Sequence, residues 1–339
     1  RKKIRPTVGS CSHHVRIEMK KISLCGLIFF FAAVALFSNN FFRILIGVEA
    51  ILLFYCARIF QKSHNADCDN FKESNSGGVG AYLINLDRAA DRLKFVTRSV
   101  EALDLPMERI AAVDGKTLSA EKIESVADLK IYQRLFKMSP EVGTIGCALS
   151  HEKAWRKFLD SDNEFAIIFE DDVQFDPQEL SAIIKSAIEK KTLWDILNFE
   201  TKHGNCFVKI SPLSSKRNIV FYLTNATHAG CYLINRKAAR RLLKKFYPIK
   251  MPLDHYFTTV WELDLIFAGV EPRMVFQTLG NSQIKISTPE KKATPSILAI
   301  NAVHNIQRAI LHFTYNLCCF LMKRRRVVGG AIIIFILIG

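Results

Sequence analysis

Three consecutive acidic residues, Glu170, Asp171 and Asp172, follow the apolar run from Phe165 to Phe169. Adjacent carboxylates repel one another and are rarely placed beside a buried strand without a compensating cation. Glu170 and Asp172 are two residues apart, so they would share one face if the strand continued that far. Their oxygens are hard ligands for Mn²⁺ or Mg²⁺, which keeps positions open for nucleotide phosphates. The triplet is therefore a candidate metal site. The alternative is a solvated acidic turn whose Asp171 or Asp172 caps the helix after Pro177.

Two other polar groups interrupt apolar segments. Ser150 and His151 end the sequence Gly146–His151, which has the apolar spacing of a helix. They would either contact substrate or satisfy buried backbone groups. Asp254 follows Pro252, and an acid just before an apolar run is also a favoured helix N-cap. Both interpretations stay open at this stage.

Alternating strands and helices are expected to position these side chains. Short apolar runs predict strands, and apolar residues at helical spacing predict helices. Asp87, at the end of the first strand, is expected to cap the first helix. Strands that alternate with helices favour an α/β sheet with ligands at the carboxyl ends of its strands. The predicted strands are 81–86, 109–113, 165–169, 194–199 and 231–234, and the predicted helices are 89–103, 143–159 and 236–246.

The order of these motifs resembles glycosyltransferase family 25, which includes lipooligosaccharide galactosyltransferases of Gram-negative bacteria. A single acidic triplet is a weak signal, whereas the ordered set is specific. The resemblance covers roughly Ala81 to Ser287. The matching segments are Asn85–Arg92, Gly146–His151, Phe169–Val173, Phe199–Thr201, His228–Ile234 and Pro252–Asp254.

The resemblance implies a GT-A-like, Rossmann-type fold with a mostly parallel sheet and flanking helices. It also implies a UDP-sugar donor, with UDP-galactose as the best candidate, and transfer with inversion to a saccharide or glycolipid acceptor of lipooligosaccharide or lipopolysaccharide. Glu170, Asp171 and Asp172 would then hold the metal and the donor diphosphate. Mn²⁺ or Mg²⁺ is the expected cofactor.

The same resemblance suggests roles for the remaining residues. Asn85, Arg88 and Arg92 are expected near the nucleotide or in the ordering of its loop. Ser150 and His151 are added as substrate-binding candidates. Inversion requires one general base for the attacking hydroxyl. Two acids are candidates for that base: Asp254 first, because an acid after a proline-containing turn can face the acceptor, and Glu200 second.

The net charge of +15 favours an anionic partner. No zinc-finger spacing, recognition-helix pattern or RNA-binding motif accompanies it, so nucleic acid is not an expected partner. The basic residues gather instead beside the apolar ends, which favours a membrane. The competing hypothesis is a catalytically inactive, membrane-anchored protein that binds a sugar nucleotide or acts as a scaffold.

Two apolar segments precede the catalytic region. The uncharged segment Ile22–Phe37 would make a helix of only ~24 Å against a hydrocarbon core of ~30 Å. Phe41–Phe60 is longer but carries Glu49 near its centre, which is costly in lipid. A hairpin or shallow anchor is favoured, which places the enzyme at the cytoplasmic face of the inner membrane. A single span would place it outside the cytoplasm.

Four parts are expected along the chain. Residues 1–62 form a basic and apolar membrane-associated segment, and residues 63–80 form a linker rich in Asn, Ser and Gly. Residues 81–290 form the catalytic domain. Residues 291–339 form a basic and apolar tail, in which Ile297–Arg326 is either an interfacial helix or a helix packed on the catalytic domain.

Overall fold

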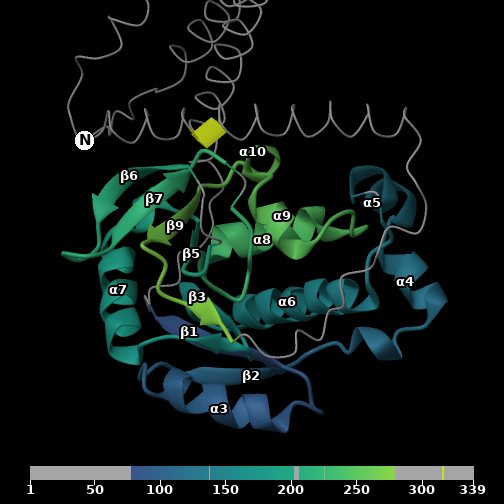
Figure 1. The fold of residues 1–339 in the computed structure, drawn as a ribbon, viewed down its shortest axis with the longest axis horizontal. Coiled ribbons are helices and arrows are strands. Elements are labelled where there is room, and N and C mark those ends of the chain that lie inside the picture. The colour runs from purple at the N-terminus through teal and green to yellow at the C-terminus, as the bar shows by residue number, and fades with distance from the viewer. Residues whose placement is uncertain (1–77, 137, 202–205, 225, 279–314, 317–339) are drawn as a thin grey trace, which may run out of the picture. The chain divides into compact units, whose positions relative to one another are not determined.

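A computed structural model describes residues 78–136, 138–201, 206–224, 226–278 and 315–316 (Figure 1). The apolar segments Ile22–Phe37 and Phe41–Phe60 lie outside these residues, as does Ile297–Arg326 apart from 315–316. Within the described ranges, no helix combines the length and hydropathy that a membrane crossing requires. The expected membrane segment therefore stays a prediction.

A mixed eight-stranded sheet forms the centre of the described region, in the order β2-β1-β3-β8-β5-β9-β7-β6. Strands β2, β1, β3, β5, β9 and β6 run in one direction, and β8 and β7 run in the other. A two-stranded ribbon pairs β4 with β10. The strands are β1 (Val79–Asn85), β2 (Met107–Ala111), β3 (Phe165–Glu170), β4 (Val173–Gln174), β5 (Ile196–Asn198), β6 (Phe207–Pro212), β7 (Asn218–Tyr222), β8 (Cys231–Asn235), β9 (Phe267–Glu271) and β10 (Phe276–Gln277).

Helices flank this sheet. Helices α3 and α6 lie on opposite sides of β1 and β2 (Figure 1). Helix α6 also packs against α8 and α9. The α-helices are α3 (Ala90–Glu101), α4 (Ala120–Val126), α5 (Leu129–Phe136), α6 (Val142–Asp160), α7 (Pro177–Glu189), α8 (Arg236–Phe246), α9 (Leu253–Phe257) and α10 (Val260–Leu263), and the short 3₁₀ turns are η2 (Gly115–Thr117) and η3 (Lys191–Leu193).

Strand β3 forms the buried axis of the sheet. Residues Phe165 to Phe169 are all at most 2% exposed, and β1 and β8 pair with the two edges of the strand. A continuous apolar run is the pattern expected of such a strand. Glu170 and Asp172 are partly exposed, whereas Asp171 is buried, so the acidic triplet lies at the boundary of the core.

Most of the predicted elements are present with small shifts at their ends. The strand predicted at 109–113 occupies Met107–Ala111, and the helix predicted at 143–159 occupies Val142–Asp160. The expected capping role of Asp87 is wrong. Ala89 is the N-cap of α3, and Asp87 instead accepts a hydrogen bond from Arg109 at 2.5 Å.

Candidate active site

The carboxyl ends of β1 and β3, with the loop after β2 and the start of α6, enclose a cavity of about 490 Å³. Parallel strands end at the same edge of a sheet, so the polar residues that terminate them converge there. Its polar lining combines acids of the triplet with cationic groups. The charged and polar lining residues are Asn85, Arg88, Arg92, Asp114, Lys116, Glu141, Ser150, His151, Glu170, Asp171, Asp172, Gln277 and Thr278.

Asp171 is held entirely by protein groups. Asn85 Nδ2 donates to its Oδ2 at 2.7 Å, and Arg92 Nη2 lies 3.1 Å from its Oδ1. Burial raises the pKa of Asp171, while Asn85 and Arg92 act to lower it. Asn85 is itself fixed by Arg109, whose Nε donates to Asn85 Oδ1 at 3.1 Å. Asp171 thus ties the end of β3 to β1 and α3.

Asp172 has a different environment. Its Oδ1 is buried and has no hydrogen-bond partner among the described residues. Its Oδ2 lies 3.7 Å from Arg92 Nη1, and its backbone carbonyl accepts two hydrogen bonds from Thr278 at 2.8 Å. Burial, followed by the charges of Glu170 and Asp171, raises the pKa of Asp172 to about 7. A buried carboxylate oxygen without a donor is costly. This atom is suited to a cation.

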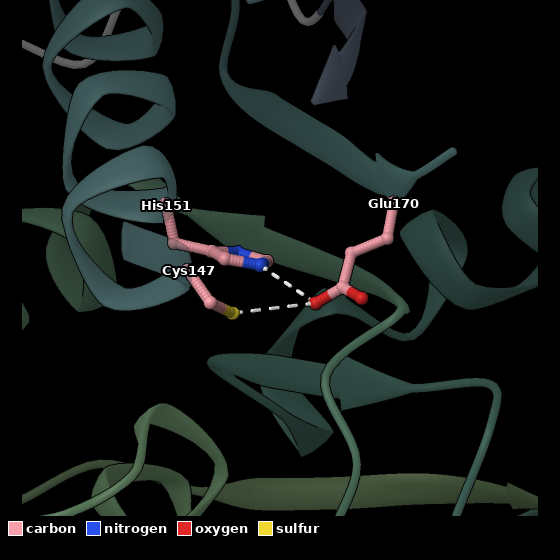
Figure 2. Close-up of side chains that lie close together, drawn as sticks. All are labelled: Cys147, His151 and Glu170. Carbon is pink, nitrogen blue, oxygen red and sulfur yellow. Dashed lines mark hydrogen bonds and ion pairs between the residues drawn. The ribbon is translucent and has the colours of Figure 1, made fainter. Parts of the chain in front are cut away.

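Glu170 belongs to a hydrogen-bonded chain that runs back into the core (Figure 2). His151 Nε2 lies 3.1 Å from Glu170 Oε1, and Cys147 Sγ donates to the same oxygen at 3.6 Å. His151 Nδ1 lies 2.9 Å from Tyr232 Oη, which also accepts from Trp155 Nε1 at 2.9 Å. Burial acts to raise the pKa of Glu170, but contacts with His151 and Cys147 and the charge of His228 act against it, and together they lower the pKa.

The proton on His151 Nε2 follows from the carboxylate. Glu170 has a lowered pKa, and its ionised carboxylate can only accept, so Nε2 of His151 carries the proton of their contact. Cys147, His151 and Glu170 are close enough to hold a metal ion together. With this tautomer, His151 offers no lone pair to that ion, and the chain instead fixes the orientation of Glu170. Cys147 is also a soft ligand, which Mn²⁺ and Mg²⁺ do not favour.

Carboxylate oxygens from Asp172 and Glu170 fit a hard divalent cation better. Asp172 supplies a buried oxygen that lacks a donor, and Glu170 supplies the charge that most perturbs it after burial. If the site binds Mn²⁺ or Mg²⁺, these two residues would hold it. Asp171, whose oxygens already accept from Asn85 and Arg92, would act as their support.

Ser150 connects two backbone segments at the cavity wall. Its Oγ donates to the carbonyl of Gly146 at 2.6 Å and accepts from the Val113 amide at 2.8 Å. A Cβ at Gly146 would lie 2.6 Å from the Val113 carbonyl oxygen, so only glycine allows this approach. Ser150 was expected either to contact substrate or to satisfy buried backbone groups, and these contacts show that it satisfies backbone groups.

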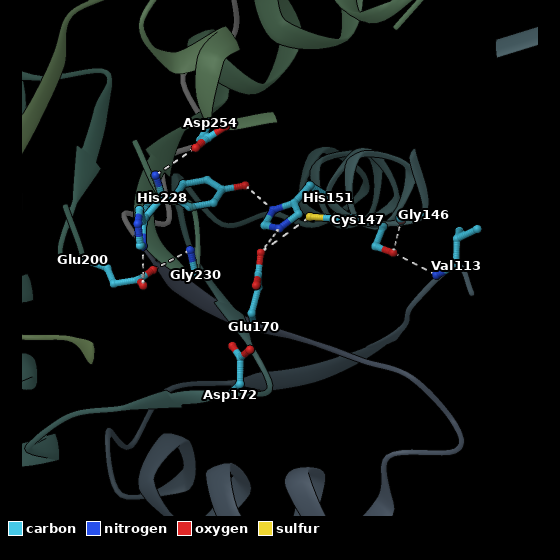
Figure 3. Close-up of polar contacts among 12 residues, drawn as sticks. Val113, Gly146, Cys147, His151, Glu170, Asp172, Glu200, His228, Gly230 and Asp254 are labelled. Atoms are coloured by element: carbon cyan, nitrogen blue, oxygen red, sulfur yellow. Dashed lines mark hydrogen bonds and ion pairs between the residues drawn. The ribbon is translucent and has the colours of Figure 1, made fainter. Parts of the chain in front are cut away.

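A second group of polar residues lies beside the triplet, where β8 begins (Figure 3). Glu200 is 1% exposed, and its Oε2 accepts from the Gly230 amide at 2.8 Å. Its Oε1 lies 3.1 Å from His228 Nδ1. Asp254 Oδ2 accepts from the backbone amide of His228 at 3.1 Å. Burial raises the pKa of Glu200, and the hydrogen bond from His228 opposes that rise.

The reversed direction of β8 explains this second group. Because β8 runs antiparallel between β3 and β5, its first residues lie at the edge where those two strands end. The Glu170 amide accordingly donates to the Gly230 carbonyl at 2.8 Å. Glu200 and Asp254, both predicted as site residues, are therefore brought together by His228.

Arg88 lines the cavity and forms an ion pair with Asp114.

Sequence reasoning gives no role to His228, Gly230 or Asp114. The segment His228–Ile234 enters only as part of the ordered resemblance. The sequence carries one signal for His228, a histidine directly before Ala-Gly at the start of an apolar run. That signal does not reveal the reversed strand direction that brings it to Glu200.

The family model described as Glycosyltransferase family 25 (LPS biosynthesis protein) matches residues 79–257, which include every site residue above apart from Gln277 and Thr278 of the cavity wall. The chain belongs to glycosyltransferase family 25. The family's matched range begins at the first residue of β1 and ends with α9. The predicted family is confirmed.

Curated relatives match the same region. Procollagen galactosyltransferase 1-A of Xenopus laevis is 26% identical over 217 residues, covering 58% of this chain and 35% of the relative. A glycosyltransferase 25 family member of Aedes aegypti is 28% identical over 182 residues, covering 52% of this chain and 30% of the relative. The chain thus spans about a third of the length of these relatives.

Solved structures give only a distant likeness. The structure of S. aureus TarS 1-349 in complex with UDP-GlcNAc has a TM-score of 0.37 and 12% sequence identity, covering 75% of this chain and 76% of that chain. A likeness of this size does not bear on the site.

Proposed function

We propose that this family 25 protein is a metal-dependent, inverting galactosyltransferase that transfers galactose from UDP-galactose to a saccharide acceptor. The observation that carries the proposal is Asp172 Oδ1, a buried carboxylate oxygen with no donor in the described region, at the edge of a 490 Å³ cavity. The family membership supports glycosyl transfer. The name of the Xenopus laevis relative supports galactose.

The charge arrangement of the cavity suits a sugar nucleotide. Arg88, Arg92 and Lys116 line it and would face the anionic diphosphate. Helix α6 begins at its wall with Val142, and a helix N-terminus also favours negative charge. A cavity of this volume lies within the range that small-molecule sites occupy. We infer a GT-A-type donor site on this basis.

Each part of the site has a separate task in this proposal. A divalent cation held by Asp172 and Glu170 would neutralise charge on the departing diphosphate. The chain from Trp155 through Tyr232 and His151 fixes Glu170, so its carboxylate does not reorient during transfer. The acceptor hydroxyl attacks the anomeric carbon from the side away from the diphosphate, and its proton passes to a protein base.

The acceptor is proposed to be a saccharide of a glycolipid such as lipopolysaccharide, in line with the family's description. The relatives named for procollagen leave a polypeptide acceptor as a second outcome to test. Membrane association at the cytoplasmic face is likewise proposed, from the basic and apolar ends alone. A reporter fused near Gly80 tests it, and an extracytoplasmic signal would overturn it.

A donor screen tests the proposed activity. The full chain is incubated with Mn²⁺ and each of UDP-galactose, UDP-glucose, UDP-GlcNAc and UDP-GalNAc, and UDP release is measured with methyl β-glycosides, a procollagen peptide or no acceptor. UDP-galactose is expected to be the preferred donor, and EDTA is expected to stop turnover. UDP binding without turnover on any acceptor would favour the inactive sugar-nucleotide-binding alternative.

A further inference from the structure

The geometry at the start of β8 points to His228 as the group that takes the proton from the acceptor hydroxyl. We propose that Glu200 and Asp254 act as positioning residues for it. This inference rests on the proposed function and assigns the base to a residue that the sequence did not suggest. Four observations support this inference. They are the positive φ of His228, the contact of its ring with Glu200, its position beside Glu170, and the hydrogen bonds that Glu200 and Asp254 already accept.

The backbone of His228 is held in an unfavourable conformation. Its φ of 86° lies in the left-handed region that side chains with a Cβ rarely adopt. Two contacts maintain it: the amide donates to Asp254 Oδ2 at 3.1 Å, and the carbonyl accepts from Asn198 Nδ2 at 2.7 Å. Strain that neighbouring residues maintain in this way is typical of functional sites.

The ring of His228 is oriented by a carboxylate that solvent does not reach. Glu200 is 1% exposed, whereas the His228 side chain is 33% exposed. When Glu200 is ionised, the Nδ1 proton of His228 is donated to Oε1, which leaves the lone pair on Nε2. A carboxylate that fixes the tautomer of a histidine and stabilises its protonated form is the arrangement that activates a histidine base.

Neither acid is as well placed to take the proton. Both oxygens of Glu200 already accept, one from Gly230 and one from His228. Asp254 Oδ2 accepts from the His228 amide, and proton uptake there would weaken the contact that holds the strained backbone. His228 and Asp254 are both partly exposed, but only the His228 ring has a buried carboxylate, that of Glu200, against it among the contacts that the structure describes for this group.

Glu170 lines the donor cavity, whereas His228 does not. Figure 3 shows Glu170 between the cavity residues Val113 and Cys147 and the pair of His228 and Glu200. The Glu170 amide donates to the carbonyl of Gly230, two residues after His228, so the start of β8 lies beside the end of β3. Inversion requires the attacking hydroxyl and the leaving diphosphate on opposite sides of the anomeric carbon.

The proposed step balances without another reactant. The acceptor oxygen forms a bond to the anomeric carbon while the bond from that carbon to the diphosphate oxygen breaks, and the diphosphate leaves with the electron pair. The hydroxyl proton moves to His228 Nε2. Glu200, which follows β5, contacts the ring of the resulting imidazolium, and Asp254 from α9 holds the backbone amide of the same residue. Glu170 from β3 is the next carboxylate, and its charge interacts with that of His228.

The substitution His228→Asn removes the proposed base but keeps the backbone conformation and the contact with Glu200. Asparagine tolerates positive φ, and its side-chain amide can replace Nδ1–H as the donor to Glu200, while no equivalent of Nε2 remains. With UDP-galactose as donor and the acceptor that gives the fastest UDP release, kcat is expected to fall at least about 100-fold. A fall of this size is usual for the loss of a general base. The KM for UDP-galactose and the midpoint of thermal unfolding are expected to stay unchanged.

The pH dependence of kcat distinguishes a base from a structural residue. The wild-type profile is expected to show an acidic limb that His228→Asn lacks and Asp254→Asn retains. Glu200→Gln is expected to move the limb to lower pH, because the imidazolium loses its counter-charge. His255→Asn, which removes a neighbouring histidine, is the matched control and is expected to keep kcat within about threefold.

Each outcome decides between the hypotheses. If wild-type protein transfers sugar and His228→Asn keeps its rate and its acidic limb, the inference is overturned and the proposed function stands. If the limb disappears in Asp254→Asn instead, Asp254 is the base. If wild-type protein releases no UDP from any donor, the proposed function and this inference both fail. Should His228→Asn not fold, an unmoved limb in Glu200→Gln still contradicts the inference.

Discussion

Replacing Asp172 with asparagine should stabilise the metal-free protein while it removes activity. The pKa of Asp172 is raised from 3.8 to about 7, because burial and the charges of Glu170 and Asp171 disfavour its ionised form. A shift of about three pKa units corresponds to roughly 4 kcal/mol. A carboxyl whose folded-state pKa is raised stabilises the fold when it is protonated, so this contribution is present below 3.8 and lost as the pH rises to about 7.

The asparagine side chain would keep the shape of the aspartate without its charge, and the backbone carbonyl of residue 172 would still accept from Thr278. Without metal at pH 8, we therefore expect Asp172→Asn to increase the free energy of unfolding by up to about 4 kcal/mol, and by less than half as much at pH 5. The assay is urea unfolding in EDTA at both pH values, followed by the fluorescence of the buried Trp155 and Trp194. Mn²⁺ should then stabilise wild-type protein but not the variant.

Asp104→Asn is a suitable control for this experiment. Asp104 is exposed and has a φ of 56°, which asparagine also tolerates, so its substitution should change the free energy of unfolding by less than about 0.5 kcal/mol at either pH. Equal or lower stability of Asp172→Asn at pH 8 in EDTA would refute the reasoning. Such a result would mean that the Asp172 carboxylate is already well satisfied without a cation.

Three other substitutions test neighbouring parts of the site. Gly230→Ala places a methyl group against Glu200 Oε2, so we expect about 1–3 kcal/mol of destabilisation in urea and reduced kcat; wild-type values for both would contradict the close contact. Ser150→Ala leaves the Val113 amide without its acceptor, so the free energy of unfolding should fall by about 1–3 kcal/mol while UDP affinity is retained. A loss of UDP affinity without a loss of stability would indicate that Ser150 contacts substrate. Arg92→Met should weaken UDP binding at least about tenfold by calorimetry, and unchanged binding would place the diphosphate elsewhere.

The sequence predicts the site correctly where an apolar run forms a parallel strand and the polar residues follow directly at its carboxyl end. The apolar run before Glu170 predicted a buried strand, and the structure places β3 there with both neighbours paired. Asn85 and Arg92 are expected near the nucleotide or in the ordering of its loop, which stays a prediction, and the structure shows that both contact Asp171. Asn85 ends β1, so the parallel pairing of β1 and β3 brings it to the triplet, and Arg92 reaches the triplet from the first turn of α3, which packs against β1.

Strand direction was the information that the sequence lacked. The apolar residues Cys231–Ile234 predict a strand in either direction, because burial patterns alone do not distinguish parallel from antiparallel pairing. The reversal of β8 places His228 and Gly230 beside Glu200. Capping was also misjudged at Asp87, because Arg109 competes for its carboxylate through a tertiary contact. Asp176 is the N-cap of the helix that begins at Pro177, so the alternative in which Asp171 or Asp172 caps this helix is wrong.

The most direct test of the central claim is the position of the metal. Crystals of the full chain grown with Mn²⁺ and UDP can be measured at a wavelength where Mn²⁺ scatters anomalously. We predict an anomalous peak at about 2.0–2.2 Å from Asp172 Oδ1, with UDP phosphate oxygens completing the coordination in the cavity. A peak bound by Cys147 and His151 without Asp172, or no peak while UDP is bound, would contradict it.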